Sequence, residues 1–496
     1  MLKEGDIVKL IFGLKVQDLR QAAGLSYQQL SDRTGLAISY LHGIEKGKKY
    51  PKADKILALA KALDTHYDYL VSLEPNKRLR PVIELLRSDF LKIFPLETFG
   101  ISTTKLLELL VQAPEKVNAF IGTIIKITRN FNLQGEDFYK SALRSYQDLH
   151  DNYFPELEQA AASYRRQHNY SPEQVLSIAQ LRAMLQNEYG IQVDRTFLAS
   201  HPELRHLRSV YVPDRKQLYL GERLDPAQER FLLAKELGFQ CLQLAERPLE
   251  TRMLEVDSFE KLLANFYASY FAVALLLPET SMIKLLQQMR TWERWQGAQL
   301  LEFLDTQLIS SEMFLQRMAN VLPYHFGIRQ LFFLRFYNSG PDRKFVVTKE
   351  MHLSQLHDPY ANQLDEHYCR RWISISLIRK LQIQGEATQP LVGAQISRYW
   401  NTPNAYFCIC FAKPTRDNWQ HSSSVTLGLR VNEQLLQVFP FLQHDPGILT
   451  RDVHTTCERC PIQDCEARAA QPIFWQRQQQ KAVVLKHLRE LLGKGE

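Results

Sequence analysis

Three cysteines near the end of the chain have a spacing that could bind a metal. Cys457, Cys460 and Cys465 follow the pattern C-x2-C-x4-C, and a C-x2-C turn holds two thiolates at a separation that one metal ion can bridge. A complete zinc ribbon needs a second C-x2-C pair, which this sequence lacks. Three thiolates with a distant fourth ligand suit zinc or an iron–sulfur cluster, and the spacing does not choose between them. We expect a metal or cluster here in preference to free thiols.

A second candidate site lies in the segment F-L-L-A-K-E-L-G-F, residues 231–239. It has the outline of an H-E-x-x-H helix, in which two His one turn apart hold Zn²⁺ and the Glu deprotonates the bound water. The two His positions here are Lys235 and Phe239. Phe has no lone pair and Lys is normally cationic near neutral pH, so we expect no zinc at this site. Glu236, at the position of the base, is then a leftover or a structural partner for Lys235 or a nearby Arg.

The context of this helix indicates a family. The segment A-N-F-Y-A-S-Y-F-A-V-A-L-L-L-P follows at residues 264–278, and the two segments together resemble the ImmA/IrrE-type metallopeptidase domain. The resemblance implies that a Glu four residues before Phe271 supplies a third metal ligand, and this chain has Tyr267 there. We therefore predict a degenerate zincin-like α+β domain that keeps the fold without the reaction. Its expected elements are helices at 174–189 and 230–244 and strands at 191–193, 209–212 and 216–220.

The first part of the chain, residues 7–73, is predicted to form five short helices with breaks at Gly24, Gly35, Gly47 and Pro51. Ser26 and Gln29 have the spacing of a capping box at the start of the second helix. In the third helix, Leu41 and Ile44 fall on the buried face. The opposite side is left free to meet a partner, and it carries Ser39, Tyr40, His42, Gly43 and Lys46.

This pattern resembles the Cro/C1 (xenobiotic-response-element) helix-turn-helix over most of its length, with Ala37 where that family often has a Ser or Thr cap. The resemblance implies that the third helix enters the major groove of DNA, usually as a dimer on two half-sites. Lys48, Lys49 and Lys52 could neutralise phosphates, and the alternative for them is a solvated loop. The predicted DNA-contacting residues are Gln28, Ser39, Tyr40, His42, Lys46, Lys48, Lys49 and Lys52.

After a helical connector, the last part of the chain is predicted to contain strands at 327–337, 344–349, 405–412 and 424–430. The order of these parts and the cysteine motif resemble the short-chain fatty acyl transcriptional regulators. That family carries a Cys-Pro-x-Trp element, matched here by C-R-R-W at residues 369–372, which implies Cys369 as the fourth ligand. The resemblance also implies a DNA-binding regulator that senses an acyl-CoA thioester.

The composition is consistent with a multidomain protein, mainly α with α+β parts. The chain has 496 residues, a net charge of +7 and 45% hydrophobic residues, and no apolar run long enough for a membrane span, so we expect a cytoplasmic protein. The predicted domains are a Cro/C1 head (1–74), a helical connector or dimerisation region (75–170), the peptidase-like domain (171–310) and a sensor-like domain with the cysteines (311–496). Two alternatives stay open: a redox or iron sensor acting through the cysteines, and a metallopeptidase that cleaves a partner repressor.

Overall fold

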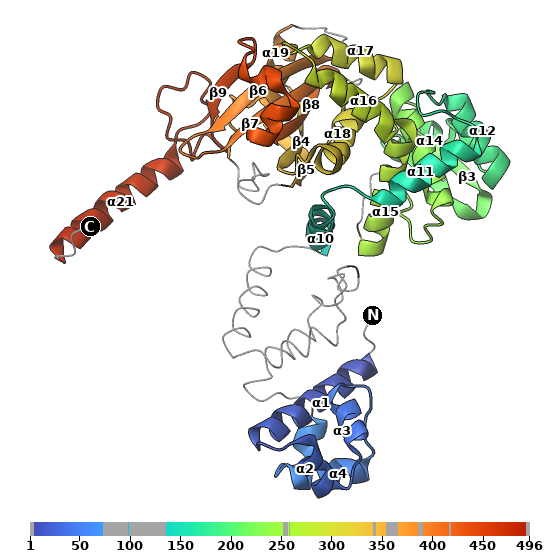
Figure 1. The fold of residues 1–496 in the computed structure, drawn as a ribbon, viewed down its shortest axis with the longest axis vertical. Helices are drawn as coiled ribbons and strands as arrows, with labels where there is room; N and C mark the ends of the chain where they lie inside the picture. Colours follow the sequence, from blue (N-terminus) through green and yellow to red (C-terminus); the bar gives the residue numbers. More distant parts are fainter. Residues whose placement is uncertain are drawn as a thin grey trace. The chain divides into compact units, whose positions relative to one another are not determined.

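A computed structural model describes residues 4–72, 135–250, 258–340, 344–353, 366–384, 390–415 and 418–492, with residues 98 and 256 as single positions (Figure 1). The chain forms two compact units, which we describe separately. The first contains Met1–Leu143 with Glu255–Leu262, and the second contains Arg144–Leu254 with Leu263–Glu496. Most of the predicted helical connector, at residues 73–134, lies outside the described residues.

The head of the first unit has the five helices that the sequence predicts. Their bounds are α1 (Glu4–Ala22), α2 (Tyr27–Thr34), α3 (Ile38–Glu45), α4 (Ala53–Ala62) and α5 (Tyr67–Val71). One core joins them, built on fully buried side chains such as Leu30, Leu41, Ile44 and Leu59. Apolar residues three and four apart on each helix point into this core, which fixes how the short helices pack.

Local interactions set the start and end of α2. The Ser26 side chain accepts a hydrogen bond from the Gln29 amide, and the Gln29 side chain accepts one from the Ser26 amide, as the capping box predicts. Gly35 ends the helix in the left-handed region at φ 69°. Ala37 begins α3 without a side-chain cap.

The second unit begins with a helical layer over a small sheet. Its elements are α10 (Gly135–Leu149, which starts in the first unit), α11 (Pro155–Gln167), α12 (Ile178–Tyr189), β1 (Gln192–Asp194), α13 (Phe197–Ser200), η2 (Pro202–Leu204), β2 (Ser209–Val212), η3 (Pro213–Arg215), β3 (Gln217–Leu220), α14 (Pro226–Cys241) and α15 (Phe259–Leu276). The strand order is β1-β3-β2, with β1 parallel and β2 antiparallel to β3. The two helices and three strands predicted for this part are all present; β2 has the predicted bounds, and each of the others differs at one or both ends.

A larger sheet completes the second unit. Its elements are α16 (Glu279–Arg290), α17 (Gly297–Gln307), α18 (Ser311–Phe326), β4 (Leu331–Asn338), β5 (Phe345–His352), α19 (Ile373–Ile383), β6 (Leu391–Tyr399), β7 (Ala405–Thr415), β8 (Asn418–Arg430), α20 (Glu433–Val438), η4 (Pro440–Gln443), β9 (Leu449–Val453) and α21 (Ile473–Leu491). The order is β5-β4-β8-β7-β6-β9, and only the β6–β9 pair is parallel. The sequence predicted four of these strands and missed β6 and β9.

Helices cover both faces of this sheet (Figure 1). On one face, α19 packs on β7 and β8, and the buried Cys408 and Cys410 belong to that core. On the other face, side chains such as Phe407 and Phe411 join a core that continues through α18 into α14 and α15. One hydrophobic core therefore spans the predicted peptidase-like and sensor-like domains.

No single helix in the described ranges is long and apolar enough to cross a membrane, whereas α15 and α16, bent by 65°, satisfy the length and composition test as a pair.

Candidate DNA interface, peptidase-like pocket and cysteine loop

The exposed side of the α2–α3 hairpin carries most of the predicted DNA-contacting side chains. Gln28, Ser39 and His42 are exposed, and the Gln28 amide donates a 2.9 Å hydrogen bond to Asp32. Leu41 and Ile44 are buried, as predicted. Gly43, in contrast, is also buried, because the Lys49 side chain lies over it; our prediction that Gly43 is free to meet a partner is wrong.

Basic residues surround Tyr40 at the edge of this surface. The ammonium groups of Lys49 and Lys55 lie 5.2 and 4.4 Å from the centre of the Tyr40 ring, within cation–π distance. Lys48, Lys49 and Lys52 are exposed, and Lys46 is half-buried at the C-terminal end of α3. The cations thus line the end of α3 and the start of α4. Tyr40 itself is half-buried.

An ion pair that the sequence analysis missed holds the end of α3. Arg20 donates hydrogen bonds of 2.6 and 2.9 Å to the two carboxylate oxygens of Glu45, and the Tyr27 hydroxyl donates a third of 2.7 Å. The Arg20 guanidinium also lies 4.1 Å from the Tyr27 ring centre. Hydrogen bonding to Glu45 raises the pKa of Arg20, and burial together with Glu45 raises that of Tyr27 to about 12. This network joins α1, α2 and α3 under the exposed surface.

Helix α14 places Lys235 and Glu236 in the core of the second unit. Asp225 starts the helix with a capping box to Gln228, and the helix is buried along most of its length. The Lys235 ammonium donates a 2.6 Å hydrogen bond to the Asn265 side chain on α15. Burial, reinforced by Lys349 and Arg247, lowers the pKa of Lys235 to about 7.

Glu236 has a structural partner. Its two carboxylate oxygens accept hydrogen bonds of 2.9 and 2.6 Å from Arg247, whose guanidinium also stacks 4.2 Å from the ring centres of Phe239 and Tyr211. This agrees with the expectation that Glu236 pairs with Lys235 or a nearby Arg. Both carboxylate oxygens of Glu236 are therefore already hydrogen-bonded, and Gln240 donates a further 2.8 Å hydrogen bond to one of them.

Tyr267, which stands where the resemblance implies a third metal ligand, forms a hydrogen bond elsewhere. The Tyr267 hydroxyl pairs with that of Tyr146 at 2.7 Å, away from Lys235. The side chain that reaches Lys235 from α15 is Asn265, two residues earlier. The reason is helical geometry: positions two apart on a helix face different directions. Zinc prefers imidazole nitrogen, thiolate sulfur and carboxylate oxygen as donors. The side chains at this site, those of Lys235, Phe239 and Asn265, are of none of these types.

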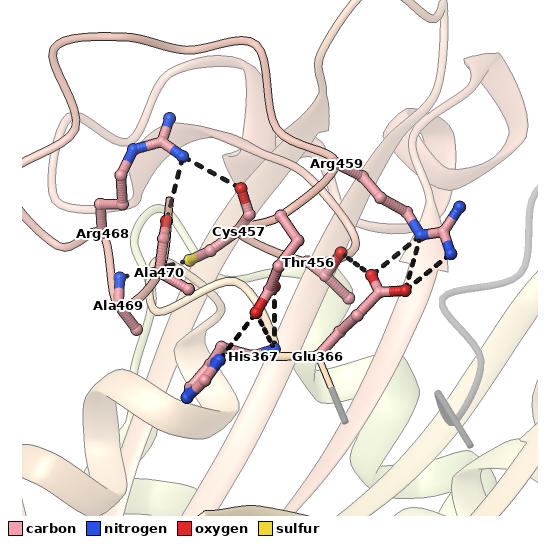
Figure 2. A network of polar contacts seen from close by, with 9 residues as sticks. Glu366, His367, Thr456, Cys457, Arg459, Arg468, Ala469 and Ala470 are labelled. Carbon is pink, nitrogen blue, oxygen red and sulfur yellow. Dashed lines mark hydrogen bonds and ion pairs between the residues drawn. The ribbon is translucent and has the colours of Figure 1, made fainter. Parts of the chain in front are cut away.

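The cysteine motif forms a loop stabilised by hydrogen bonds (Figure 2). Arg468 donates to the carbonyls of Cys457, Cys460 and Ile462, so its guanidinium closes the loop. An antiparallel bridge between Tyr368 and Thr456 pairs the segment of Cys369 with that of Cys457: the Cys369 amide donates to the Thr455 carbonyl and the Cys457 amide to the His367 carbonyl. On either side of this bridge, Arg459 pairs with Glu366 and His367 with Glu458.

The four predicted ligand cysteines lie in this loop and in the short segment that pairs with it. Cys369, Cys457 and Cys460 are buried and Cys465 is half-buried. Burial, with a smaller contribution from Cys457 and Cys460, raises the pKa of the Cys369 thiol to about 11. Within the described ranges, no three His, Cys, Asp or Glu side chains are grouped so that they could hold a metal ion. Thiols are a donor type that zinc and iron–sulfur clusters use, and a metal at these cysteines stays a prediction.

Comparison with known proteins agrees with both motif assignments. Residues 16–70 match the helix-turn-helix family model, and residues 186–318 match the model of the IrrE N-terminal-like domain. The chain combines these two domains. We use the names helix-turn-helix head and IrrE-like domain below.

Two relatives are similar to parts of the chain. An uncharacterized HTH-type transcriptional regulator of Bacillus subtilis, YobD, is 36% identical over 59 residues, which are 12% of this chain and 53% of YobD. The chain therefore spans about half the length of this curated relative. A solved Mycobacterium tuberculosis transcriptional regulator aligns with 67% of this chain and 93% of its own, at 16% identity and a TM-score of 0.47.

Two adjoining cavities, of about 920 and 270 Å³, lie between the IrrE-like domain and the large sheet. They share walls at Arg208, Arg335 and Lys413. We call them together the basic cavity. Its acidic residues are Asp225 and Glu312, and its basic residues are Arg205, Arg208, Arg223, Lys235, Arg335, Lys349 and Lys413.

The register of β4 against β5 brings two of these basic side chains together. Arg335 on β4 lies directly opposite Lys349 on β5, and both reach Glu312, at 3.6 and 3.3 Å. Burial opposes the ionisation of Glu312, but Lys349 and Arg335 outweigh it and lower its pKa. The sequence analysis missed these residues. The available signal was a charge inside an apolar strand, as in L-F-F-L-R-F-Y for Arg335.

Proposed function

We propose that this protein is a sequence-specific DNA-binding transcriptional regulator whose helix-turn-helix head reads the operator. The observation that carries the proposal is the exposed surface of α2 and α3. Gln28, Ser39 and His42 are available to base edges or phosphates, and the lysines at the end of α3 and start of α4 suit the phosphate backbone. Because helix-turn-helix heads read paired half-sites, we propose that the protein binds as a homodimer.

The test is binding of the full chain to DNA from upstream of its own gene, measured by a gel shift and fluorescence anisotropy. We expect Lys46→Ala to weaken binding and deletion of the head to abolish it. Lys61→Ala, which removes an exposed lysine from the far end of α4, serves as the matched control. Equal binding to scrambled DNA of the same length would contradict sequence-specific recognition.

We further propose that an acyl-CoA-type metabolite controls DNA binding and occupies the basic cavity. The cavity has seven basic and two acidic side chains in its walls, which suits a ligand with several phosphate groups. Two cations that face each other across β4 and β5 share one carboxylate, and like charges in this position repel. An anion between them would relieve that repulsion. Control requires that the ligand bind the DNA-competent and incompetent states with different affinity.

Isothermal titration calorimetry of the full-length protein with acyl-CoA thioesters of increasing acyl length tests this assignment. Arg335→Gln should weaken binding about tenfold or more, because a charged hydrogen bond contributes about 1.5–3 kcal/mol. Arg398→Gln, on the exposed side of β6 and paired with Asp452, is the control. Equal loss in both variants, or no binding by any thioester, would argue against the assignment.

The cysteine loop supports a second candidate function, a redox- or iron-responsive input. Cys369, Cys457, Cys460 and Cys465 would hold the zinc ion or cluster, and Arg468 would keep the loop in place by binding its carbonyls. A cluster would supply a reversible one-electron change. Metal analysis and a visible spectrum of anaerobically purified protein distinguish zinc, a cluster and free thiols. Cys457→Ser should lower metal content, whereas Cys241→Ser should leave it unchanged.

We propose that the IrrE-like domain has no peptidase activity. Support comes from Lys235 bonded to Asn265 and from Glu236 bonded to Arg247 at the positions where a peptidase would hold zinc and its water. The alternative is cleavage of a partner repressor. Incubation of the full chain with zinc and with casein or a repressor decides: cleavage that Glu236→Gln abolishes would overturn this proposal.

A further inference from the structure

Lys235 is a buried amine that faces open space. The residue is only 5% exposed, yet it lines the smaller part of the basic cavity and a second small pocket beside Glu236 and Arg247. Its hydrogen bond is to the neutral amide of Asn265. In the part of the chain that the structure describes, no carboxylate forms an ion pair with it. The amine is therefore desolvated without a counter-ion, which favours its neutral form.

The charged groups around Lys235 act in both directions, and burial decides the result. Lys349 and Arg247 oppose its protonation, and Glu236 and Glu250 favour it; burial is the largest effect, and the pKa falls to about 7. A neutral amine keeps an N–H for Asn265 and has a lone pair for reaction. Lysines become nucleophiles in this way, through burial and through a neighbouring cation.

We propose that Lys235 is an acylation site, at which its amine takes an acyl group from an activated acyl donor carried on an anion. The cations Arg208, Arg335, Lys349 and Lys413 line the same cavity and would attract and hold the anionic carrier. Small polar groups from Ser269, Ser310 and Ser311 also line it, and they leave room for a short acyl chain.

The step is an aminolysis. The Lys235 nitrogen attacks the carbonyl carbon, the new C–N bond forms, and the bond from that carbon to phosphate oxygen or thioester sulfur breaks. The leaving group departs as the phosphate or thiol, and the proton lost by the nitrogen passes to the leaving group or to solvent. The product is an amide that carries no charge, so Lys235 can no longer be protonated. The inference rests on the proposed function only for the identity of a natural donor, an acyl-CoA-type thioester.

The probe is acetyl phosphate, an anionic acyl donor that contains no CoA. The full wild-type chain is incubated with it between pH 6 and 10, and peptide mass spectrometry follows acetylation of each lysine with time. Lys413 and Lys349, in the same cavity, are internal references. At pH 7.5 we expect Lys235 to be acetylated at least about tenfold faster than Lys413, because each unit by which a pKa is lowered towards neutrality raises the neutral fraction about tenfold.

The dependence on pH separates this role from ordinary surface acetylation. The Lys235 rate should level off above neutral pH, whereas the Lys413 rate should keep rising. Lys349→Met removes a cation that opposes protonation of Lys235, so it should move the Lys235 profile to higher pH. An unmodified Lys235 beside modified Lys349 and Lys413, or a Lys235 rate that rises to pH 10, overturns the proposal. If the protein binds acyl-CoA but Lys235 is not acetylated, only the acylation proposal is wrong. If Lys235 is acetylated but the protein does not bind acyl-CoA, only the sensing proposal is wrong.

Discussion

Arg20 on α1 and Glu45 at the end of α3 form a two-pronged ion pair, with hydrogen bonds of 2.6 and 2.9 Å and with only 11% and 2% of the two side chains exposed. The pair lies directly beneath the surface that we assign to DNA. Tyr27 adds a third hydrogen bond from α2. The orientation of α3 therefore depends on a charge pair between helices as well as on Leu41 and Ile44.

Breaking this ion pair should lower the free energy of unfolding of the helix-turn-helix head. Arg20→Met leaves the Glu45 carboxylate buried with only Tyr27 as partner, and removal of one member of a buried pair costs about 3–5 kcal/mol. Hydrogen exchange of the full chain, followed by mass spectrometry, should show faster exchange in peptides from α1 to α3. Asp54→Asn, an exposed change in the first turn of α4, is the control, and equal exchange in both variants would contradict a role for the pair.

Phosphate contacts should be visible as a salt dependence. Each lysine that neutralises a phosphate adds about 0.9 to the slope of log affinity against log salt concentration. Lys48→Ala, Lys49→Ala and Lys52→Ala together should lower that slope by about 2 to 3 and weaken binding to all sequences alike. If the slope matches that of Lys61→Ala, these lysines form a solvated loop, the alternative reading of the sequence.

A missing cap offers a stabilising change. Ala37 has the extended backbone of a helix N-cap, φ −62° and ψ 142°, without a side-chain hydrogen bond. Ala37→Ser should supply one and stabilise α3 by about 1 kcal/mol. Slower hydrogen exchange at the start of α3 is the expected result; Ala37→Gly is a comparison that changes the backbone without adding a cap. No difference between Ser and Ala would show that water already satisfies these amides.

Lys235 should make the stability of the second unit depend on pH. Its pKa is about 7 in the folded chain and about 10.4 when unfolded. Between these values the unfolded chain binds more protons, so stability should increase as pH rises from 7 towards 10. Lys235→Met should remove this increase and stabilise the protein near pH 7. All six Trp lie at residue 292 or beyond, so Trp emission during urea unfolding reports on this unit alone, and a pH dependence unchanged by the substitution would disprove the account.

The sequence by itself determined features that arise within a few residues of each other. The capping box of Ser26 and Gln29, the buried positions Leu41 and Ile44, and the five helices of the head depend on helical period and on local hydrogen bonds, and the structure confirms them. The outline of the IrrE-like domain was predictable for the same reason, because its motif helix and the segment before Pro278 are continuous stretches.

Only the tertiary structure decided which distant residues meet. It paired Lys235 with Asn265, joined Arg20 to Glu45, and paired the segment of Cys369 with that of Cys457 through a bridge between short extended segments. It also built the basic cavity, because the register of β4 against β5 sets Arg335 opposite Lys349. Helix rotation and strand register depend on how whole faces pack, and a shift of one residue would turn each of these side chains elsewhere.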